Sequence, residues 1–314
     1  MTEARPAPQS DRTGPAMGTR PRRRLSPRAW KVLTLAPALA LFLLLTLLPL
    51  ANLAALSLHE VEWLDREAVW TWVGGRNYAR IAEDTLFRAG ILNTIVFAVV
   101  AVALQMVIGF TLALTTTRIT RGRVFYRTVF VLPILVPGIV IGAIWKLMYS
   151  FDFGVINQIL LLLGIAPVDW LGDRSLALIS VIVVDVWHWT PFCYLLLLAA
   201  LETLPRDIYE AAEIDGASFW QQLRRLTLPL MAPALVVTFV FRMILAFKVF
   251  DEIYLLTGGG PGTATEVISF TIYRRFFTED QVGYGAAISL ATIGVIAVLI
   301  VTMSRVATSR EAAT

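Results

Sequence analysis

A polar stretch between residues 204 and 229 interrupts two long apolar segments and has the residue types of a docking site. Asp-Gly leaves the helical region at little steric cost, and Ser218 with Gln221 has the spacing of a capping box that starts a new helix. The stretch therefore predicts two short amphipathic helices joined by a bend. Because a plain connector needs only a few residues, we predict that this hairpin docks a soluble partner. The residues that carry this pattern run from Glu210 to Ser218 and from Leu226 to Leu230.

Aromatic and ionisable side chains inside the apolar segments form a second candidate site. Counting about 1.5 Å per residue from Pro229 places Arg242 roughly 20 Å along its helix, near the membrane midplane. A similar count places Trp187, His188 and Trp189 at comparable depth. Aromatic faces beside hydrogen-bond donors suit a sugar, whose C–H faces stack while its hydroxyls need partners. These residues are candidates for the wall of a substrate path.

Three further residues extend this candidate path toward the outer end of the same segment. Phe247, Asp251 and Tyr254 recur at helical spacing and are predicted to share one face. A second interpretation stays open for the whole group, because polar groups at mid-membrane face either a cavity or a partner helix. In that interpretation the two tryptophans pack on neighbouring helices, and Arg242 pairs with a carboxylate or a carbonyl.

Residue types for metal or nucleotide chemistry are scarce. The chain has two histidines, His59 and His188, without metal spacing around them, and its single cysteine, Cys193, lies in an apolar run. A glycine-rich run at residues 258–262 is not followed by Gly-Lys-Ser or Gly-Lys-Thr, so it is not a phosphate-binding loop. We therefore expect no cofactor, no metal and no ATPase site in this chain.

The composition of the chain indicates that these residues belong to a membrane protein. Apolar residues make up 57% of the chain, charged residues 16%, and the mean hydropathy is +0.70. An all-α integral membrane protein is predicted, with six runs long enough for a hydrocarbon core about 30 Å thick. The runs are 32–57, 91–117, 124–150, 176–202, 229–256 and 284–305. Residues 155–165 are too few to span, so an interfacial or re-entrant segment is expected there.

Basic residues orient these six spans. Seventeen of the 27 Lys and Arg residues fall in the two tails, the loop near residue 121 and the hairpin, and seven fall in the opposite loops. This bias predicts that both termini and the hairpin are cytoplasmic. The predicted organisation is a disordered basic tail at 1–28, a six-span domain at 29–306 and a short tail at 307–314. The basic cluster before the first span is explained by contact with anionic lipid, so no nucleic-acid partner is expected.

The hairpin carries a family resemblance. Glu210-Ala211-Ala212, three residues, Gly216, nine residues and then Leu226-x-Leu228-Pro229 resemble the signature of permease subunits of bacterial binding-protein-dependent ATP-binding-cassette (ABC) importers. Six spans with this motif between the fourth and fifth also resemble the core architecture of that family, the type I importer fold. The resemblance covers residues 30–306. It implies a bacterial cell-membrane protein whose hairpin holds the coupling helix.

The resemblance also implies partners and residue roles. The expected partners are a second homologous permease, two copies of a nucleotide-binding ATPase subunit that hold ATP and magnesium, an extracytoplasmic solute-binding protein and membrane lipid. Glu210 would anchor the hairpin electrostatically in a cleft of the ATPase, and the alanines after it would pack closely. Gly216 would form the turn, with Asp215 capping it. For Trp220 and Arg224, ATPase contact and interfacial anchoring stay open.

A second motif narrows the resemblance to carbohydrate uptake. The run from Phe250 to Gly262, with Thr265, Glu266 and Tyr273 after it, resembles the end of the fifth span in permeases for maltose, glycerol phosphate and polyols. It is similar to the first of the two permeases in such systems. The alternative is a secondary transporter of small polar solutes without an ATPase. That class shows internal repeats and interrupted half-helices with midplane acids, and no such repeat is found here.

Overall fold

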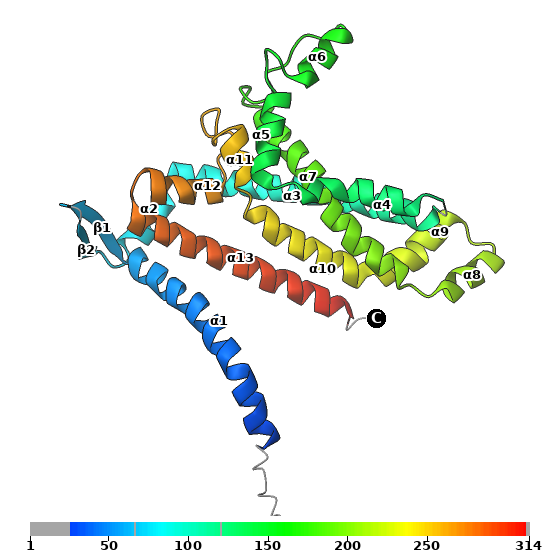
Figure 1. Ribbon diagram of the computed structural model, residues 1–314, viewed down its shortest axis with the longest axis horizontal. Helices are drawn as coiled ribbons and strands as arrows, with labels where there is room; N and C mark the ends of the chain where they lie inside the picture. The colour runs from blue at the N-terminus through cyan, green and yellow to red at the C-terminus, as the bar shows by residue number, and fades with distance from the viewer. Residues whose placement is uncertain (1–25, 66, 120, 312–314) are drawn as a thin grey trace, which may run out of the picture. The chain divides into compact units, whose positions relative to one another are not determined.

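The computed structural model describes residues 26–65, 67–119 and 121–311 (Figure 1). The chain divides after Ala51 into two compact units. The first contains most of helix α1 (Pro27–Ser57), in which residues 30–57 are long and apolar enough to cross a membrane. Most of the tail predicted at 1–28 lies outside the described residues. At the other end, helix α13 (Val282–Glu311) continues past residue 306.

The second unit is built on three packed helices, α3 (Thr85–Arg118), α7 (Ala177–Glu202) and α10 (Leu228–Phe247). Helices α3 and α7 lie along each other, and α10 packs on both (Figure 1). Their contact surface is a buried apolar cluster that includes Phe97, Val181 and Met243. Helix α13 packs on α10. Each of these four helices is long and apolar enough to span a membrane, as the sequence predicts.

The third predicted span is broken. Residues 124–150 form α4 (Arg123–Val131), a 3₁₀ turn η1 (Leu132–Leu135) and α5 (Gly138–Met148), and the two arms meet at 93°. Pro137 cannot continue a helix, and it holds Val136 in an extended conformation. The run predicted at 124–150 is therefore present as a bent pair of helices and not as one continuous helix. The described residues hold five apolar spanning helices, or six if the bent pair counts as one.

Short elements cover the ends of the spans opposite the hairpin. They are an antiparallel pair of strands, β1 (His59–Leu64) and β2 (Glu67–Trp72), and three helices: α2 (Arg76–Glu83), α11 (Asp251–Leu256) and α12 (Ile268–Tyr273). A π-helical turn, η3 (Arg274–Thr278), joins α12 to the loop before α13. Helix α6 (Val155–Leu162) is the short apolar segment expected between the third and fourth spans. The strand pair is a small exception to the predicted all-α class.

Candidate functional site

The polar stretch between α7 and α10 forms the predicted helical hairpin. It consists of α8 (Arg206–Ile214), α9 (Phe219–Gln222) and a π-helical turn η2 (Leu223–Thr227) that leads into α10. Helix α8 begins after Pro205, which has no amide proton to leave unsatisfied. We refer to residues 206–227 as the coupling hairpin.

The bend of the coupling hairpin lies at Gly216, where φ is +76°. A side chain there would meet no atom within 4 Å, so glycine is required for its backbone conformation and not for space. Asp215 is the C-cap residue that follows α8, and the Gly216 and Ala217 amides donate to carbonyls of that helix. The bend predicted from Asp-Gly is thus confirmed.

The capping box is also confirmed. The Ser218 amide donates to Oε1 of Gln221 at 2.7 Å, and the Ser218 side chain accepts from the Gln221 amide. This exchange starts α9 immediately after the bend. The bend at Gly216 and the start of α9 are both fixed by interactions within the hairpin. The hairpin therefore has a defined shape before it meets any partner.

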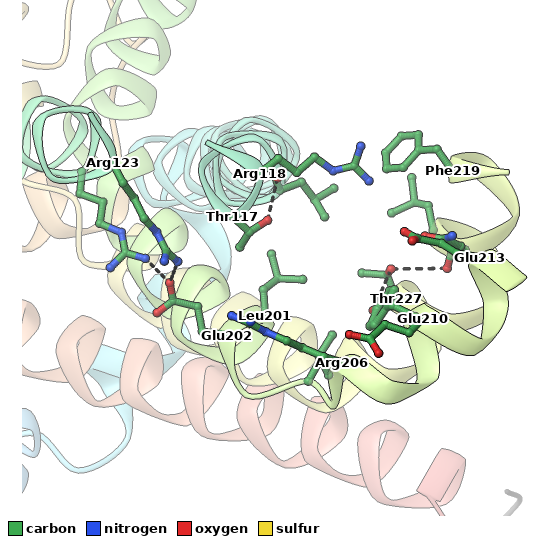
Figure 2. Close-up of a pocket in the computed structure, with 16 residues that line it drawn as sticks. Thr117, Arg118, Arg123, Leu201, Glu202, Arg206, Glu210, Glu213, Phe219 and Thr227 are labelled. Atoms are coloured by element: carbon green, nitrogen blue, oxygen red, sulfur yellow. Dashed lines mark hydrogen bonds and ion pairs between the residues drawn. The ribbon is translucent and has the colours of Figure 1, made fainter. Parts of the chain in front are cut away.

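The inner side of the coupling hairpin encloses a polar pocket with a volume of about 520 Å³ (Figure 2). Glu210 and Glu213 point into it from α8, and Arg118 reaches it from the end of α3. The guanidinium of Arg118 lies over the ring of Phe219 at 4.1 Å. Among the described residues, neither of the two glutamates forms an ion pair.

A cluster of charges closes the other side of this pocket. Arg123 and Arg127 of α4 both pair with Glu202, the last residue of α7 (Figure 2). One carboxylate thereby connects α4 to the start of the coupling hairpin.

The outer side of the coupling hairpin is apolar at its tip. Ile214 is 87% exposed and Trp220 is 63% exposed, and they flank the bend. Of the predicted coupling residues, Glu210, Ala211, Asp215, Gly216 and Arg224 are also exposed, and Ala212 is half-buried. Sequence reasoning missed Ile214, although an isoleucine next to Asp-Gly in a polar stretch is a visible signal.

The predicted path residues are not brought together as one wall. Arg242 is only 1% exposed and forms an ion pair with Asp185 of α7. Gln105 of α3 donates to the same carboxylate at 2.8 Å, and the Trp189 ring lies 5.0 Å from the guanidinium. The structure therefore shows the pairing alternative for Arg242, and the prediction that it lines a cavity is wrong. Asp185 was missed, although an acid inside an apolar run is a signal in itself.

A second buried polar pair lies beside the first. Nδ1 of His188 is 3.1 Å from Oε1 of Glu252, the second residue of α11. These two pairs border a small polar recess of about 190 Å³. We call it the outer recess. It is lined by Gly138, Asp185, His188, Trp189, Leu245, Lys248, Val249, Phe250, Asp251 and Glu252.

Trp187 lies elsewhere. It faces an apolar recess of about 500 Å³ together with Pro133 and Pro191, and its ring contacts Trp145 at 5.7 Å. Two residues along an α-helix turn the side chain by about 200°, so Trp187 and Trp189 point to different sides of α7. Only Trp189 and His188 of this predicted group reach the outer recess.

The predicted face of Phe247, Asp251 and Tyr254 is also wrong. Helix α10 ends at Phe247, the chain bends through residues 248–250, and α11 begins at Asp251. Phe247 is buried in the core, Asp251 lines the outer recess, and Tyr254 stacks on Phe250 with ring centroids 5.4 Å apart. Helical spacing failed here because the residues belong to two helices.

An ion network ties the outer elements together. Oδ2 of Asp84, which caps α3, accepts from Arg275 and from the Tyr284 hydroxyl, each at 2.8 Å. Burial by itself would raise the pKa of Asp84, but the hydrogen bonds from Tyr284 and the Phe87 amide, with the Arg275 charge, lower it. Glu266, also buried, pairs with Arg274 at 3.0 Å. Here burial dominates and raises the pKa of the Glu266 carboxyl.

In the described residues, five apolar helices long enough to span a membrane, a broken third span and a hairpin with a Glu-Ala-Ala motif together define a permease of the type I ABC importer fold. The same fold occurs in a bacterial ABC transporter that imports the acidic polysaccharide alginate. The TM-score is 0.79, with 23% sequence identity over 90% of this chain and 96% of that one.

Residues 105–309 match the family described as binding-protein-dependent transport system inner membrane component, and the chain belongs to that family. It is 40% identical to the trehalose/maltose transport system permease protein MalF of Thermococcus litoralis, over 83% of this chain and 87% of the relative. The trehalose transport system permease protein SugA of Mycobacterium tuberculosis is 33% identical over 92% of each chain. The sulfoquinovosyl glycerol transport system permease protein SmoG of Agrobacterium fabrum is 31% identical, over 85% and 86%. The chain is a multi-pass membrane permease of the ABC importer class.

Proposed function

We propose that this chain is one of two nonidentical membrane subunits of an ATP-driven importer for sugars, sugar derivatives or polyols. Three relatives are named for carbohydrate transport. One name gives trehalose, one gives trehalose and maltose, and one gives sulfoquinovosyl glycerol. Each is matched over more than four fifths of this chain. Because these substrates differ in size and charge, the common feature is the carbohydrate class and not one sugar.

The observation that carries the proposal is the geometry of the coupling hairpin. Its bend is fixed by Gly216, and two large apolar side chains, Ile214 and Trp220, are exposed on either side of that bend. Exposed apolar groups beside acidic ones are typical of a surface that another protein covers. The partner proposed is a nucleotide-binding ATPase subunit, which would seat this tip in a cleft with basic residues near Glu210.

The complete transporter proposed here contains this chain, a second homologous permease, two copies of the ATPase subunit and an extracytoplasmic solute-binding protein. ATP and magnesium would bind in the ATPase subunits, and none in this chain. The excess of Lys and Arg in the tails and the hairpin supports a cytoplasmic position for both termini and for the coupling hairpin. In that position the hairpin would lie on the side of the membrane where ATP is available.

The proposed contribution to the substrate path is the outer recess. The Trp189 ring offers a stacking face, and Lys248 and Asp251 are exposed hydrogen-bonding groups beside it. A second permease would complete the cavity around the sugar. The buried pairs behind it hold Trp189 and α11 in place.

Copurification and uptake measurements test the proposal. A tagged chain expressed with its neighbouring genes should bring down a second permease and an ATPase, and reconstituted vesicles should take up sugar only with ATP and binding protein present. Replacing both Ile214 and Trp220 by Ser should release the ATPase while the permease pair stays intact. The matched control replaces Ile139 and Ile144 on α5 by Ser, which should leave ATPase binding unchanged.

Uptake by this chain without any ATPase would overturn the proposal and would favour the alternative of a secondary transporter. The family match gives that alternative no support.

A further inference from the structure

The strand pair β1–β2 has two chemically different faces. Side chains alternate along a strand, and the register pairs His59 with Trp72, Val61 with Trp70 and Trp63 with Ala68 on one side. This side, the aromatic face, carries three of the nine tryptophans of the chain. The opposite side, the acidic face, carries Glu60, Glu62, Leu64, Glu67, Val69 and Thr71.

Packing shows which face is turned toward the membrane-spanning helices. Val61, on the aromatic face, is buried against Leu56 in the last turns of α1 and against Ala286, which lies inside α13. Glu60, on the acidic face, pairs with Arg76. Glu60, Val61 and Glu62 line a small pocket with Arg80 and with residues 280–284 at the start of α13. The aromatic face thus reaches Ala286, further into the apolar part of α13 than the residues that border Glu60 and Glu62.

The strand pair is held firmly at the end of two spans. Its first residue, His59, follows the last residue of α1 by two positions, and its Nδ1 is 2.7 Å from the Ala55 carbonyl oxygen. Asn77 of α2 donates to the carbonyl oxygens of Ser57 and His59 at 3.0 and 3.2 Å. A Cβ at Gly283 would lie 1.9 Å from the His59 oxygen, so β1 lies directly against the start of α13. The strands therefore lie at the ends of α1 and α13, two helices long and apolar enough to span a membrane.

At this level the tryptophans remain uncovered. Trp63, Trp70 and Trp72 are 57%, 46% and 65% exposed, although the His59 ring contacts two of them edge-on, at 5.5 and 5.1 Å. We propose that the aromatic face lies in the headgroup region of the lipid bilayer and anchors this end of the permease to the membrane surface. Tryptophan favours that region because its ring is apolar while its N–H needs a polar partner.

Lipid is the occupant that the geometry favours over a protein partner. The aromatic face looks along the spans, where the bilayer lies, and a soluble protein would approach from the opposite direction and meet the acidic face. The anchoring is independent of the transported substrate and of ATP hydrolysis. It gives the loop between the first two spans a fixed height relative to the membrane.

Spin labels on the two faces test this inference in the full chain reconstituted in nanodiscs of phosphatidylcholine and phosphatidylglycerol. Trp72→Cys places the label on the aromatic face, and Thr71→Cys, one residue away, places it on the acidic face. The native Cys193 is buried, and the unaltered protein treated with the same reagent serves as the blank. Accessibility is measured to oxygen, which concentrates in lipid, and to a water-soluble nickel complex.

We expect the ratio of oxygen to nickel accessibility to be several-fold higher at position 72 than at position 71. Trp63→Cys, on the aromatic face, should behave like position 72, and Glu62→Cys should behave like position 71. Equal, water-like accessibility on both faces would overturn the inference. So would a label at position 72 that is water-exposed in the nanodisc and becomes protected only when the solute-binding protein is added, because the occupant would then be a protein.

Discussion

At the scale of single residues, Arg242 and Asp185 are opposite charges buried together between α10 and α7. Removing one of a buried pair leaves the other uncompensated, which costs about 3–5 kcal/mol. We therefore expect Arg242→Ala to lower the thermal stability of the purified permease strongly and to weaken its assembly. The readout is the unfolding temperature in detergent, together with the amount of intact complex on size exclusion.

The control is the double variant Asp185→Leu with Arg242→Met, which removes both charges. Exchanging a buried pair for apolar side chains of similar volume is often close to neutral, so stability should return. A single Arg242→Ala variant that is as stable as the unaltered protein would contradict the structural role of the pair.

The lowered pKa of Asp84 leads to a prediction about how the stability of the protein depends on pH. Its pKa is lowered in the folded protein, so its carboxylate stabilises the fold above the unfolded-state pKa, near 4, and that contribution disappears as pH falls through the folded pKa. Asp84→Asn keeps a capping oxygen for α3 but removes the charge. The variant should be less stable than the unaltered protein at pH 7 and should approach it at pH 3. A gap in melting temperature that is the same at both pH values would show that the charge is unimportant.

At the scale of elements, the coupling hairpin allows the backbone conformation at Gly216 to be tested separately from side-chain volume. A Cβ at Gly216 would touch nothing within this chain, yet φ is positive there. Holding a non-glycine residue in that conformation costs about 1–2 kcal/mol, whereas asparagine tolerates it better. Gly216→Val should therefore insert normally but lose transport and bind the ATPase weakly. Gly216→Asn should keep most of both.

These two variants are compared by sugar uptake and by ATPase pull-down from the same membranes. Loss of function in both would mean that the partner needs the space around Gly216, and not the bend. Full function in both variants would show that coupling does not depend on the bend.

At the scale of the whole molecule, variants of the two tryptophans of α7 distinguish a role in the substrate path from a role in assembly. Trp189→Ala should lower sugar uptake, because its ring borders the outer recess, while ATPase activity stimulated by the binding protein survives in part. Trp187→Ala is the matched control, since Trp187 faces the apolar recess next to Pro133. It should leave the path open and instead reduce recovery of the complex. Equal loss of uptake with intact assembly in both variants would show that the outer recess is not the substrate path.

The sequence by itself determined the features that depend on neighbours along the chain. Six apolar runs, the bias of basic residues, the bend at Asp215-Gly216 and the capping box at Ser218 and Gln221 all follow from local rules. Helix caps, left-handed glycines and hydrophobic length are decided within a few residues. The family motif lies in the same local stretch, so class and coupling element were predictable together.

The tertiary structure decided everything that depends on which distant residues meet. Asp185 reaches Arg242 across 57 positions and His188 reaches Glu252 across 64. Neither partner can be chosen from spacing, because several polar groups lie at similar depth. The break between α10 and α11, the right angle between α4 and α5 and the turn of Trp187 away from Trp189 likewise came from packing. A buried charge in an apolar span must find its counter-charge in three dimensions, and the sequence states only that it needs one.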